Sequence, residues 1–251
     1  MTPSVRALAL PAALAAALTL GACTAAPVPA VTAAASAGAQ PAAAPVATAS
    51  PEPVSTVGTV PAAATVTLPL TFAVVGDSLS LGNSPDFEHG VTGELSWVHH
   101  ARGDGAVFVG GTAVEGAPSW TQADRAALLE EDVLAADVLV MALGTNDMSA
   151  DVGAARTYEA LADIAATFDA ERVLVLAVPP RRYEIDPTTT EFNAGLQSLA
   201  AEMDWEYVDA PAPVRDGDAW ADGMTGDGIH YTRAAIPLVG AAVGAALRGE
   251  E

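Results

Sequence analysis

Residues 72–80 read Phe-Ala-Val-Val-Gly-Asp-Ser-Leu-Ser, an apolar run that ends directly in glycine, aspartate and serine. A short continuous apolar run that stops at a turn signal is typical of a strand buried on both faces of a parallel sheet. The loops that carry chemistry in such sheets lie outside the carboxyl ends of the strands. Ser78 is expected at such an end, which makes it a candidate nucleophile.

A candidate base lies near the other end of the chain, in the sequence Asp227-Gly228-Ile229-His230. A serine hydroxyl is a weak nucleophile unless a neighbouring base takes its proton, and neutral imidazole suits that task at neutral pH. His230 is the candidate base. Asp227 would accept a hydrogen bond from the imidazole Nδ1–H and hold the correct tautomer. Ser78, Asp227 and His230 therefore have the residue types and the chain order of a nucleophilic triad.

Apolar runs and helical periodicity alternate in the second part of the chain. Buried strands are predicted at residues 71–75, 106–109, 137–143 and 172–178, with a weaker one at Tyr207-Val208. Helices are predicted at residues 121–132, 154–169, 188–203 and 232–248. Thr121 is the expected cap of the first helix, and Pro187 with three threonines opens the third. Such an alternation predicts a mainly parallel sheet with right-handed crossovers.

The first 67 residues differ in composition from the rest. Arg6 precedes an apolar stretch, Ala7 to Leu20, which is too short to span a bilayer and has the proportions of a signal-peptide core. The stretch ends in Leu20-Gly21-Ala22-Cys23, which resembles the bacterial lipobox, where cleavage precedes a cysteine that carries diacylglycerol. Cys23 is the only cysteine in the chain. The alternative is an ordinary signal peptide, with Cys23 incidental.

The signal peptide is assigned to residues 1–22, and a tether to residues 23–67. The tether consists almost entirely of alanine, proline, threonine, valine, serine and glycine. Its frequent prolines block a continuous helix, and no periodic apolar face is present, which is typical of an extended linker. Residues 68–251 are long enough for one domain with a single core. The sequence thus predicts an extracytoplasmic domain that lipid on Cys23 anchors to the cell membrane.

The chain has a net charge of −21 and contains no lysine. Nearly all of this charge belongs to residues 68–251, since Arg6 and Glu52 cancel. Such a surface repels nucleic acid and anionic lipid headgroups at low salt, so no nucleic-acid partner and no polyanionic substrate is expected. A need for solubility, or a compositional bias of the genome, would explain the same negative charge equally well. No cysteine follows position 23, so neither disulfides nor thiolate metal sites are available to the domain.

Ordered sequence blocks over residues 70–250 resemble the SGNH hydrolases, the GDSL-type lipases and esterases. The blocks are Gly76-Asp77-Ser78-Leu79-Ser80, Gly144-Thr145-Asn146-Asp147, and Asp227 with His230. The resemblance implies an α/β fold of the flavodoxin-like, three-layer α/β/α kind, with a five-stranded parallel sheet in the order 2-1-3-4-5. The two aspartates that flank the catalytic positions, Asp77 and Asp147, are expected to hold their loops by hydrogen bonds.

The same resemblance implies an oxyanion hole made of the backbone N–H groups of Ser78 and a glycine, together with the side-chain amide of Asn146. One such donor is typically worth about 3–4 kcal/mol of the barrier. Gly116 matches the glycine best, and Gly110 and Gly111 are the alternatives, since the asparagine usual at position 111 is missing. A purely structural turn is the alternative role for Asn146.

Two competing motifs fail on inspection. The Gly-x-Ser-x-Gly elbow of larger α/β-hydrolases would need glycine at position 80, where serine stands. Asp216, Asp218 and Asp222 faintly resemble a calcium loop, but Trp220 occupies a ligand position and no glutamate follows at the twelfth. They are interpreted as solvated loop acids, and no metal or cofactor is expected.

The predicted activity is hydrolysis of a carboxylic ester through an acyl-enzyme. Short acyl groups such as acetyl, on a cell-envelope or environmental glycan, are the expected substrate because the tether exposes the domain. A lysophospholipase or thioesterase would use the same site, as would acyl transfer to a sugar hydroxyl. The remaining alternative is a non-enzymatic, glycan-binding lipoprotein of the envelope that retains the fold.

Overall fold

The computed structural model describes residues 69–103, 105–150, 153–183 and 187–250. The chain divides into two units, residues 1–61 and 62–251, and all of the described residues belong to the second. The predicted signal peptide, Cys23 and the tether lie outside the described residues. In the ranges just given, no helix is both long enough and apolar enough to cross a membrane.

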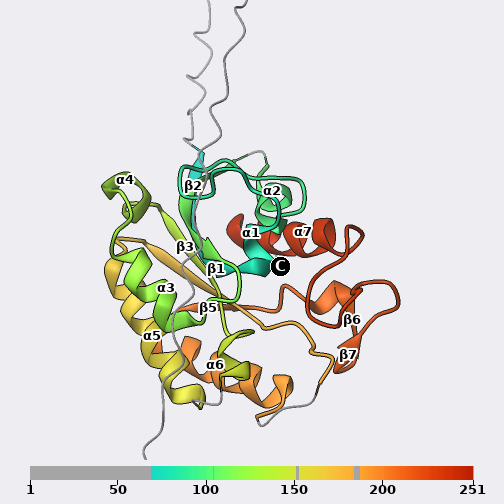
Figure 1. Ribbon diagram of the computed structural model, residues 1–251. Coiled ribbons are helices and arrows are strands. Elements are labelled where there is room, and N and C mark those ends of the chain that lie inside the picture. Colours follow the sequence, from blue (N-terminus) through green and yellow to red (C-terminus); the bar gives the residue numbers. More distant parts are fainter. Residues whose placement is uncertain (1–68, 104, 151–152, 184–186, 251) are drawn as a thin grey trace, which may run out of the picture. The chain divides into compact units, whose positions relative to one another are not determined.

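Five parallel strands form the central sheet, as the sequence predicts (Figure 1). They are β1 (Leu70–Asp77), β2 (Ala106–Val114), β3 (Val138–Ala142), β4 (Arg172–Leu176) and β5 (Glu206–Val208). Their order is β2-β1-β3-β4-β5, which confirms the expected order 2-1-3-4-5. A short antiparallel hairpin of β6 (Arg215–Asp216) and β7 (Ala219–Trp220) follows. Since β1 pairs with β2 on one side and β3 on the other, residues just past β1 are flanked by two other strand ends.

Helices connect the strands and cover both faces of the sheet (Figure 1). They are α1 (Ser78–Leu81), α2 (Trp97–Ala101), α3 (Ser119–Ala126), α4 (Glu131–Leu134), α5 (Ala154–Thr167), α6 (Thr189–Met203) and α7 (Ile236–Leu247). Two 3-10 turns, η1 (Asp147–Ser149) and η2 (Ala212–Val214), lie in loops. The threonine-rich opening of α6 is confirmed, because Thr188 and Glu191 form a reciprocal capping box.

The prediction of one helix at residues 121–132 is wrong. The stretch contains parts of two shorter helices, α3 and α4, separated by residues 127–130, and α3 begins at Ser119 behind Pro118 instead of behind Thr121. Proline has a fixed φ that suits the entry to a helix, and the carbonyl of Pro118 accepts a hydrogen bond of 3.1 Å from the N–H of Thr121. The short helices α1 and α2 have too few residues to show a helical period.

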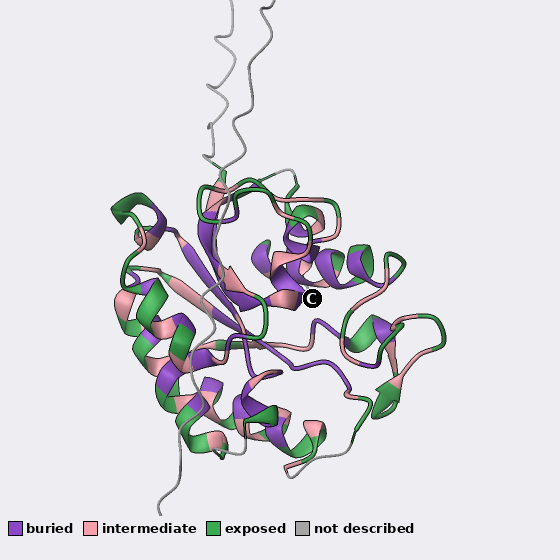
Figure 2. Cartoon of the chain, viewed as in Figure 1, coloured by how far each residue is buried: buried purple, intermediate pink, exposed green. Residues whose placement is uncertain are grey.

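The sheet is buried on both faces, which explains its continuous apolar runs (Figure 2). Along β1, Phe72 and Val74 pack with α2 and α7, whereas Ala73 and Val75 pack with α3, α5 and α6. All four are fully buried. Alternate residues of a strand point to opposite faces, so one strand contributes to two apolar clusters. The result is the expected three-layer arrangement, with the strand ends free to carry functional loops.

Candidate active site

The first candidate residue lies at the carboxyl edge of the sheet. β1 ends at Asp77, and Ser78 begins the single turn α1. The Asp77 side chain caps this turn, because its Oδ1 accepts a hydrogen bond of 2.9 Å from the backbone N–H of Leu79. The cap fixes the direction in which the chain leaves the strand at Ser78.

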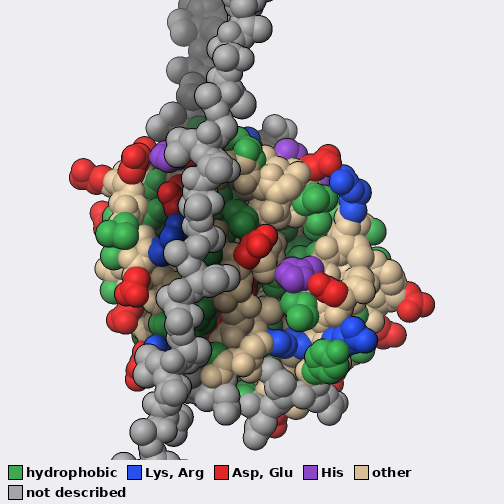
Figure 3. All heavy atoms as spheres, in the orientation of Figure 1, with side chains coloured by type: hydrophobic (Ala, Val, Ile, Leu, Met, Phe, Trp, Pro, Cys, Tyr) green, Lys and Arg blue, Asp and Glu red, His purple; other side chains and the backbone are tan. Residues whose placement is uncertain are grey.

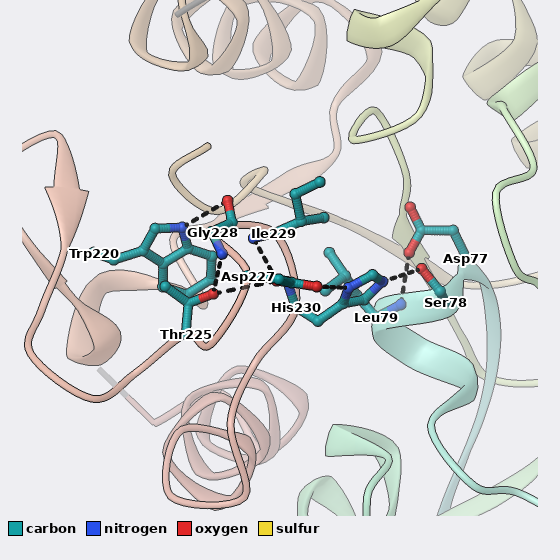
Figure 4. Close-up of polar contacts among 9 residues, drawn as sticks. All are labelled: Asp77, Ser78, Leu79, Trp220, Thr225, Asp227, Gly228, Ile229 and His230. Atoms are coloured by element: carbon teal, nitrogen blue, oxygen red, sulfur yellow. Dashed lines mark hydrogen bonds and ion pairs between the residues drawn. The ribbon is translucent and has the colours of Figure 1, made fainter. Parts of the chain in front are cut away.

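Ser78, His230 and Asp227 form one chain of hydrogen bonds (Figure 4). Ser78 Oγ lies 3.0 Å from His230 Nε2, and His230 Nδ1 lies 2.7 Å from Asp227 Oδ2. These distances suit a neutral imidazole whose Nδ1–H donates to the carboxylate while Nε2 accepts from the hydroxyl. The fold thus brings together three residues that are far apart in the sequence.

The Asp227 carboxylate is held by its own loop. Its Oδ1 accepts hydrogen bonds of 2.8 Å from the backbone N–H groups of Ile229 and His230, which leaves Oδ2 for the imidazole. Thr225 Oγ1 accepts a hydrogen bond of 2.8 Å from the Gly228 N–H and closes the same turn. The hydrogen bond from the His230 side chain is the main reason that the pKa of Asp227 is lowered. Asp227 is therefore an oriented anion at neutral pH.

The Asp-x-x-His spacing occurs twice in this chain. Asp86 and His89 share it, and His89 Nδ1 lies 2.7 Å from Asp86 Oδ1, the same distance as in the pair beside Ser78. The hydrogen bond that His89 donates to the Asp86 carboxylate raises the pKa of His89. The second nitrogen of His89 faces a carboxylate, Glu130 Oε1 at 4.0 Å, and not a serine. The spacing alone therefore does not identify the site, whereas the contact with Ser78 does.

A cavity of about 680 Å³ opens beside Ser78. Gly116, Asn146 and His230 line it together with Ser78. Much of the remaining wall is aliphatic: Leu79, Leu95, Ile229 and Ile236. Figure 3 shows acidic side chains around the margin of one face and a histidine that reaches the surface near its middle. The volume lies within the roughly 300–1,000 Å³ of pockets that hold small ligands.

Of the three candidate glycines, Gly116 is the one that lines this cavity. Gly110 and Gly111 lie within β2, where they pair with Ala73 and Val74 of β1. A Cβ at position 111 would lie 1.9 Å from the Val74 carbonyl oxygen, so the close approach of the two strands there admits only glycine. An asparagine at position 111 would therefore clash with β1 in this structure.

The side-chain amide of Asn146 is engaged on both sides. Its Nδ2 donates to Asp77 Oδ2 at 3.1 Å and to the carbonyl oxygen of Ala117 at 3.2 Å. An amide NH₂ has two hydrogens, so both are in use. An oxyanion forming beside Ser78 would have to share or displace one of these acceptors.

The carboxyl group of Asp77 is almost completely buried, with an exposed fraction of 1%. Burial raises its pKa to about 7, although the hydrogen bond from the Leu79 N–H acts in the opposite direction. The neighbouring Asp147 raises the pKa further, and His230 lowers it. Asp77 therefore titrates near neutral pH while it contacts the Asn146 amide.

Asp147 and Arg181 fix the loop that follows β3. The Asp147 carboxylate accepts hydrogen bonds from the Ser119 N–H at 3.1 Å and from the Ser119 hydroxyl, as expected of a loop-holding residue. Arg181 donates to the Thr145 carbonyl and, at 2.6 Å, to Ser149 Oγ. The sequence did not single out Arg181, because no motif or spacing marks an arginine whose partners lie on another loop.

Metal-ligating side chains do not gather in groups of three or more anywhere in the described ranges. Asp216 belongs to β6, and Asp218 accepts a hydrogen bond of 2.8 Å from Thr190 Oγ1. Two acids of the faint calcium-like pattern thus belong to loop and hairpin structure.

Residues 74–235 match the model of the GDSL-like lipase/acylhydrolase family. The chain belongs to this family. It is accordingly a carboxylic ester hydrolase, and the alternative of a non-enzymatic binding protein falls away. No curated protein matches the chain.

Several solved structures share the fold. A carbohydrate acetylesterase from Sinorhizobium meliloti is 20% identical, with a TM-score of 0.56 over 72% of this chain and 99% of that one. A catalytic mutant of an acetylxylan esterase from Geobacillus stearothermophilus is 15% identical, with a TM-score of 0.58 over 74% and 97%. A protein named TesA is 26% identical, with a TM-score of 0.56 over 71% of this chain and 98% of that one. These similarities establish the common α/β fold.

Proposed function

We propose that this GDSL-family esterase works through an acyl-enzyme on Ser78. His230 Nε2, 3.0 Å from Ser78 Oγ, accepts the hydroxyl proton as the oxygen attacks the ester carbonyl. The imidazolium, stabilised by Asp227, donates that proton to the leaving alcohol. Water then loses a proton to the same imidazole and attacks the acyl carbonyl, and the imidazolium returns the proton to Ser78 Oγ as the acyl–oxygen bond breaks and the carboxylic acid leaves. The continuous hydrogen-bond chain from Ser78 to Asp227 is the observation that carries this proposal.

The proposed oxyanion hole combines the backbone N–H groups of Ser78 and Gly116 with the side-chain amide of Asn146. This assignment is supported by the fact that all three residues line one cavity. Asn146 would exchange its bond to the Ala117 carbonyl for a bond to the oxyanion. The exchange favours the transition state, because hydrogen bonds to an ionised acceptor are roughly twice as strong as those to a neutral one.

The substrate proposed here is a short acyl group, acetyl above all, carried by a glycan. Two of the structural neighbours are named as esterases of acetylated carbohydrates. The side chain of His230 is 49% exposed, so a bulky, hydroxylated leaving group can approach the base from solvent.

A longer aliphatic acyl group is the second candidate, and the cavity itself favours it. Leu79, Leu95, Ile229 and Ile236 offer apolar contacts that an acetyl group is too small to use fully. A lysophospholipase or thioesterase would lay its acyl chain there. Acyl transfer to a sugar hydroxyl would use the same residues with an alcohol in place of water.

An acyl-chain series separates these candidates. For an acetylesterase, kcat/KM falls from p-nitrophenyl acetate to the butyrate and the octanoate, and Ser78→Ala loses all three activities. A higher kcat/KM for the octanoate would favour the long-chain candidate. Formation of an acylated sugar when sugar acceptors are added would favour transfer over hydrolysis.

Membrane anchoring through Cys23 is proposed for the same protein. The Leu-Gly-Ala-Cys sequence at residues 20–23 supports it, as does the proline-rich stretch that follows. A domain of strongly negative charge is repelled by anionic lipid headgroups, so a covalent lipid is the form of attachment that suits it.

A further inference from the structure

A second cavity, of about 240 Å³, lies between α6 and the loop that follows β5. Polar side chains dominate its lining: Thr190, Asn193, Gln197, Tyr207, Asp209 and Arg215. None of the proposed catalytic residues lines it. The volume is below the roughly 300–1,000 Å³ of pockets that hold a whole ligand, so it suits one unit of a longer molecule.

Both cavities lie at the carboxyl edge of the same sheet. Val178 and Pro180, which line the second cavity, follow β4, and Asp209 follows β5, whereas Ser78 follows β1. In the strand order, β4 is two positions from β1 and β5 is three. Since neighbouring strands are about 4.8 Å apart, the second cavity lies roughly 10–15 Å from Ser78 along this edge.

Residues 178–183, which follow β4, connect the wall of the second cavity to the loops beside the first, and hydrogen bonds hold them at two points. The backbone N–H of Arg182 donates to the Gly228 carbonyl at 2.8 Å, in the loop that carries His230. A Cβ on Gly228 would lie 2.2 Å from the Arg182 Cβ, so the two loops pack closely at this glycine. Arg181 ties the same loop to the carbonyl of Thr145. A chain-like ligand would therefore cross an ordered surface between the two cavities.

The walls of the second cavity are ordered by hydrogen bonds. Asn193 Nδ2 donates to the Val178 carbonyl at 2.9 Å, and its Oδ1 accepts from the Val178 N–H at 2.8 Å. Arg215 donates to both carboxylate oxygens of Asp209. Polar groups that are held in place before binding lose less conformational freedom when a ligand arrives.

Two side chains of this cavity offer hydrogen bonds to a ligand. Gln197 is exposed and carries both a donor and an acceptor. Burial raises the pKa of Tyr207 to about 12, with a smaller contribution from Asp209, so its hydroxyl remains a donor at all physiological pH values.

The chemistry of the cavity suits a neutral ligand rich in hydroxyl groups. A sugar hydroxyl both donates and accepts, and amide, phenol, carboxylate and guanidinium groups are all present. The charged groups are one cation, Arg215, and two anions, Asp209 and Asp218. The guanidinium of Arg215 is already paired with Asp209. An anion would meet net negative charge, and an apolar acyl chain would leave buried polar groups without partners.

We propose that the second cavity is a distal subsite for one sugar unit of a neutral oligosaccharide whose acyl group lies at Ser78. The inference rests on the proposed esterase function and narrows its substrate class from small esters to chains of several sugar units.

The test compares short and long substrates of the same chemistry. Acetylated xylo-, cello- and malto-oligosaccharides of two and six units are hydrolysed by the full-length enzyme, with p-nitrophenyl acetate as reference. We expect the wild-type kcat/KM for the hexamer to exceed that for the dimer about tenfold in at least one series, since two or three net hydrogen bonds supply such a factor.

Ala194→Trp fills the cavity, because Ala194 is an exposed residue of α6 that lines it. Ala201→Trp is the matched control, since Ala201 is exposed on the same helix about two turns further along and is not part of the lining. The ratio of kcat/KM for the hexamer to that for p-nitrophenyl acetate corrects for any loss of folded enzyme. It should fall about tenfold in Ala194→Trp and keep its wild-type value in Ala201→Trp.

The absence of a length effect in all three series, or a length effect that survives Ala194→Trp, overturns the subsite. Either result leaves the esterase function standing, as long as p-nitrophenyl acetate is hydrolysed. Failure of the esterase function has a different signature, namely hydrolysis of p-nitrophenyl acetate that Ser78→Ala does not abolish.

Discussion

The side-chain amide of Asn146 donates a hydrogen bond to the buried carboxyl group of Asp77 across 3.1 Å. Because Asp77 caps the turn that begins at Ser78, this contact holds the loop after β3 next to the proposed nucleophile. The same amide donates to the carbonyl of Ala117, next to Gly116. One side chain thus joins the ends of three neighbouring strands, β1, β2 and β3, where they meet at the cavity.

Asn146→Ala should lower kcat about a hundredfold to a thousandfold and change KM little. The reason is that an oxyanion donor meets charge that exists mainly in the transition state. The measurement is kcat per active site, with active sites counted by titration with a serine-directed phosphonate.

A purely structural role for Asn146 predicts the opposite pattern. Loss of its bonds to Asp77 and Ala117 would then lower the melting temperature and the amount of active enzyme, while kcat per titrated site stayed at the wild-type value. That result would leave only the backbone donors of Ser78 and Gly116.

Asp77→Asn should make stability less sensitive to pH. The folded-state pKa of about 7 lies above the value of about 3.9 in an unfolded chain, so this carboxyl group stabilises the folded protein most at low pH. Its contribution is lost as the pH rises from about 4 to about 7. Asparagine carries no charge, so the variant does not lose this contribution as the pH rises. The difference in melting temperature, variant minus wild type, should therefore increase by at least a few degrees from pH 5 to pH 8. Asp163→Asn, at an exposed position of α5, is the control, and an equal rise there would contradict the assignment to Asp77.

Asp227→Asn should lower kcat about a thousandfold to ten-thousandfold at similar KM. The two backbone N–H groups of Ile229 and His230 will keep the amide oxygen in the place of Oδ1, which turns the NH₂ group toward the imidazole. His230 must then accept at Nδ1 and carry its proton on Nε2, so it cannot take the proton of Ser78. A kcat within tenfold of wild type, measured on p-nitrophenyl acetate, would show that this carboxylate does not select the tautomer.

Ser78→Ala and His230→Ala should each remove activity by several orders of magnitude, and the double variant should be hardly worse. Nucleophile and base act as one unit across their 3.0 Å contact, so their losses do not add. His89→Ala, which removes the other histidine of an Asp-x-x-His pair, should keep kcat. Additive losses in the double variant, or a near-wild-type kcat in either single variant that is correctly folded, would rule out the mechanism.

Cys23→Ser should release the protein from membranes or leave its signal peptide uncleaved. A serine hydroxyl cannot form the thioether to diacylglycerol on which the proposed anchor depends. Fractionation of cells and mass spectrometry of the mature N-terminus check this. An unmodified wild-type protein that begins at another residue would refute the anchor.

The sequence by itself determined the architecture and the blocks that carry the chemistry. The apolar run that ends at Ser78 and the strand-helix alternation after it predict a parallel sheet, because a strand buried on both faces needs apolar residues at every position. Residues adjacent in sequence also share a turn, so the link from Asp227 to His230 is encoded locally. The ends of helices were harder to predict from the sequence. The helices α3 and α4 are an example, because each is short and its apolar face is defined by the elements that pack against it.

Only the tertiary structure decided which local motifs work together. Asp86 with His89 and Asp227 with His230 have the same spacing and the same 2.7 Å contact, yet the order of the strands and the final loop bring only the second pair to Ser78. The same strand order brings Asn146 into contact with Asp77. It also decides which glycine lines the cavity and allows Arg181 to anchor the loop after β3. Each of these depends on a distance between residues far apart in the chain, and such a distance is fixed only when the sheet has packed.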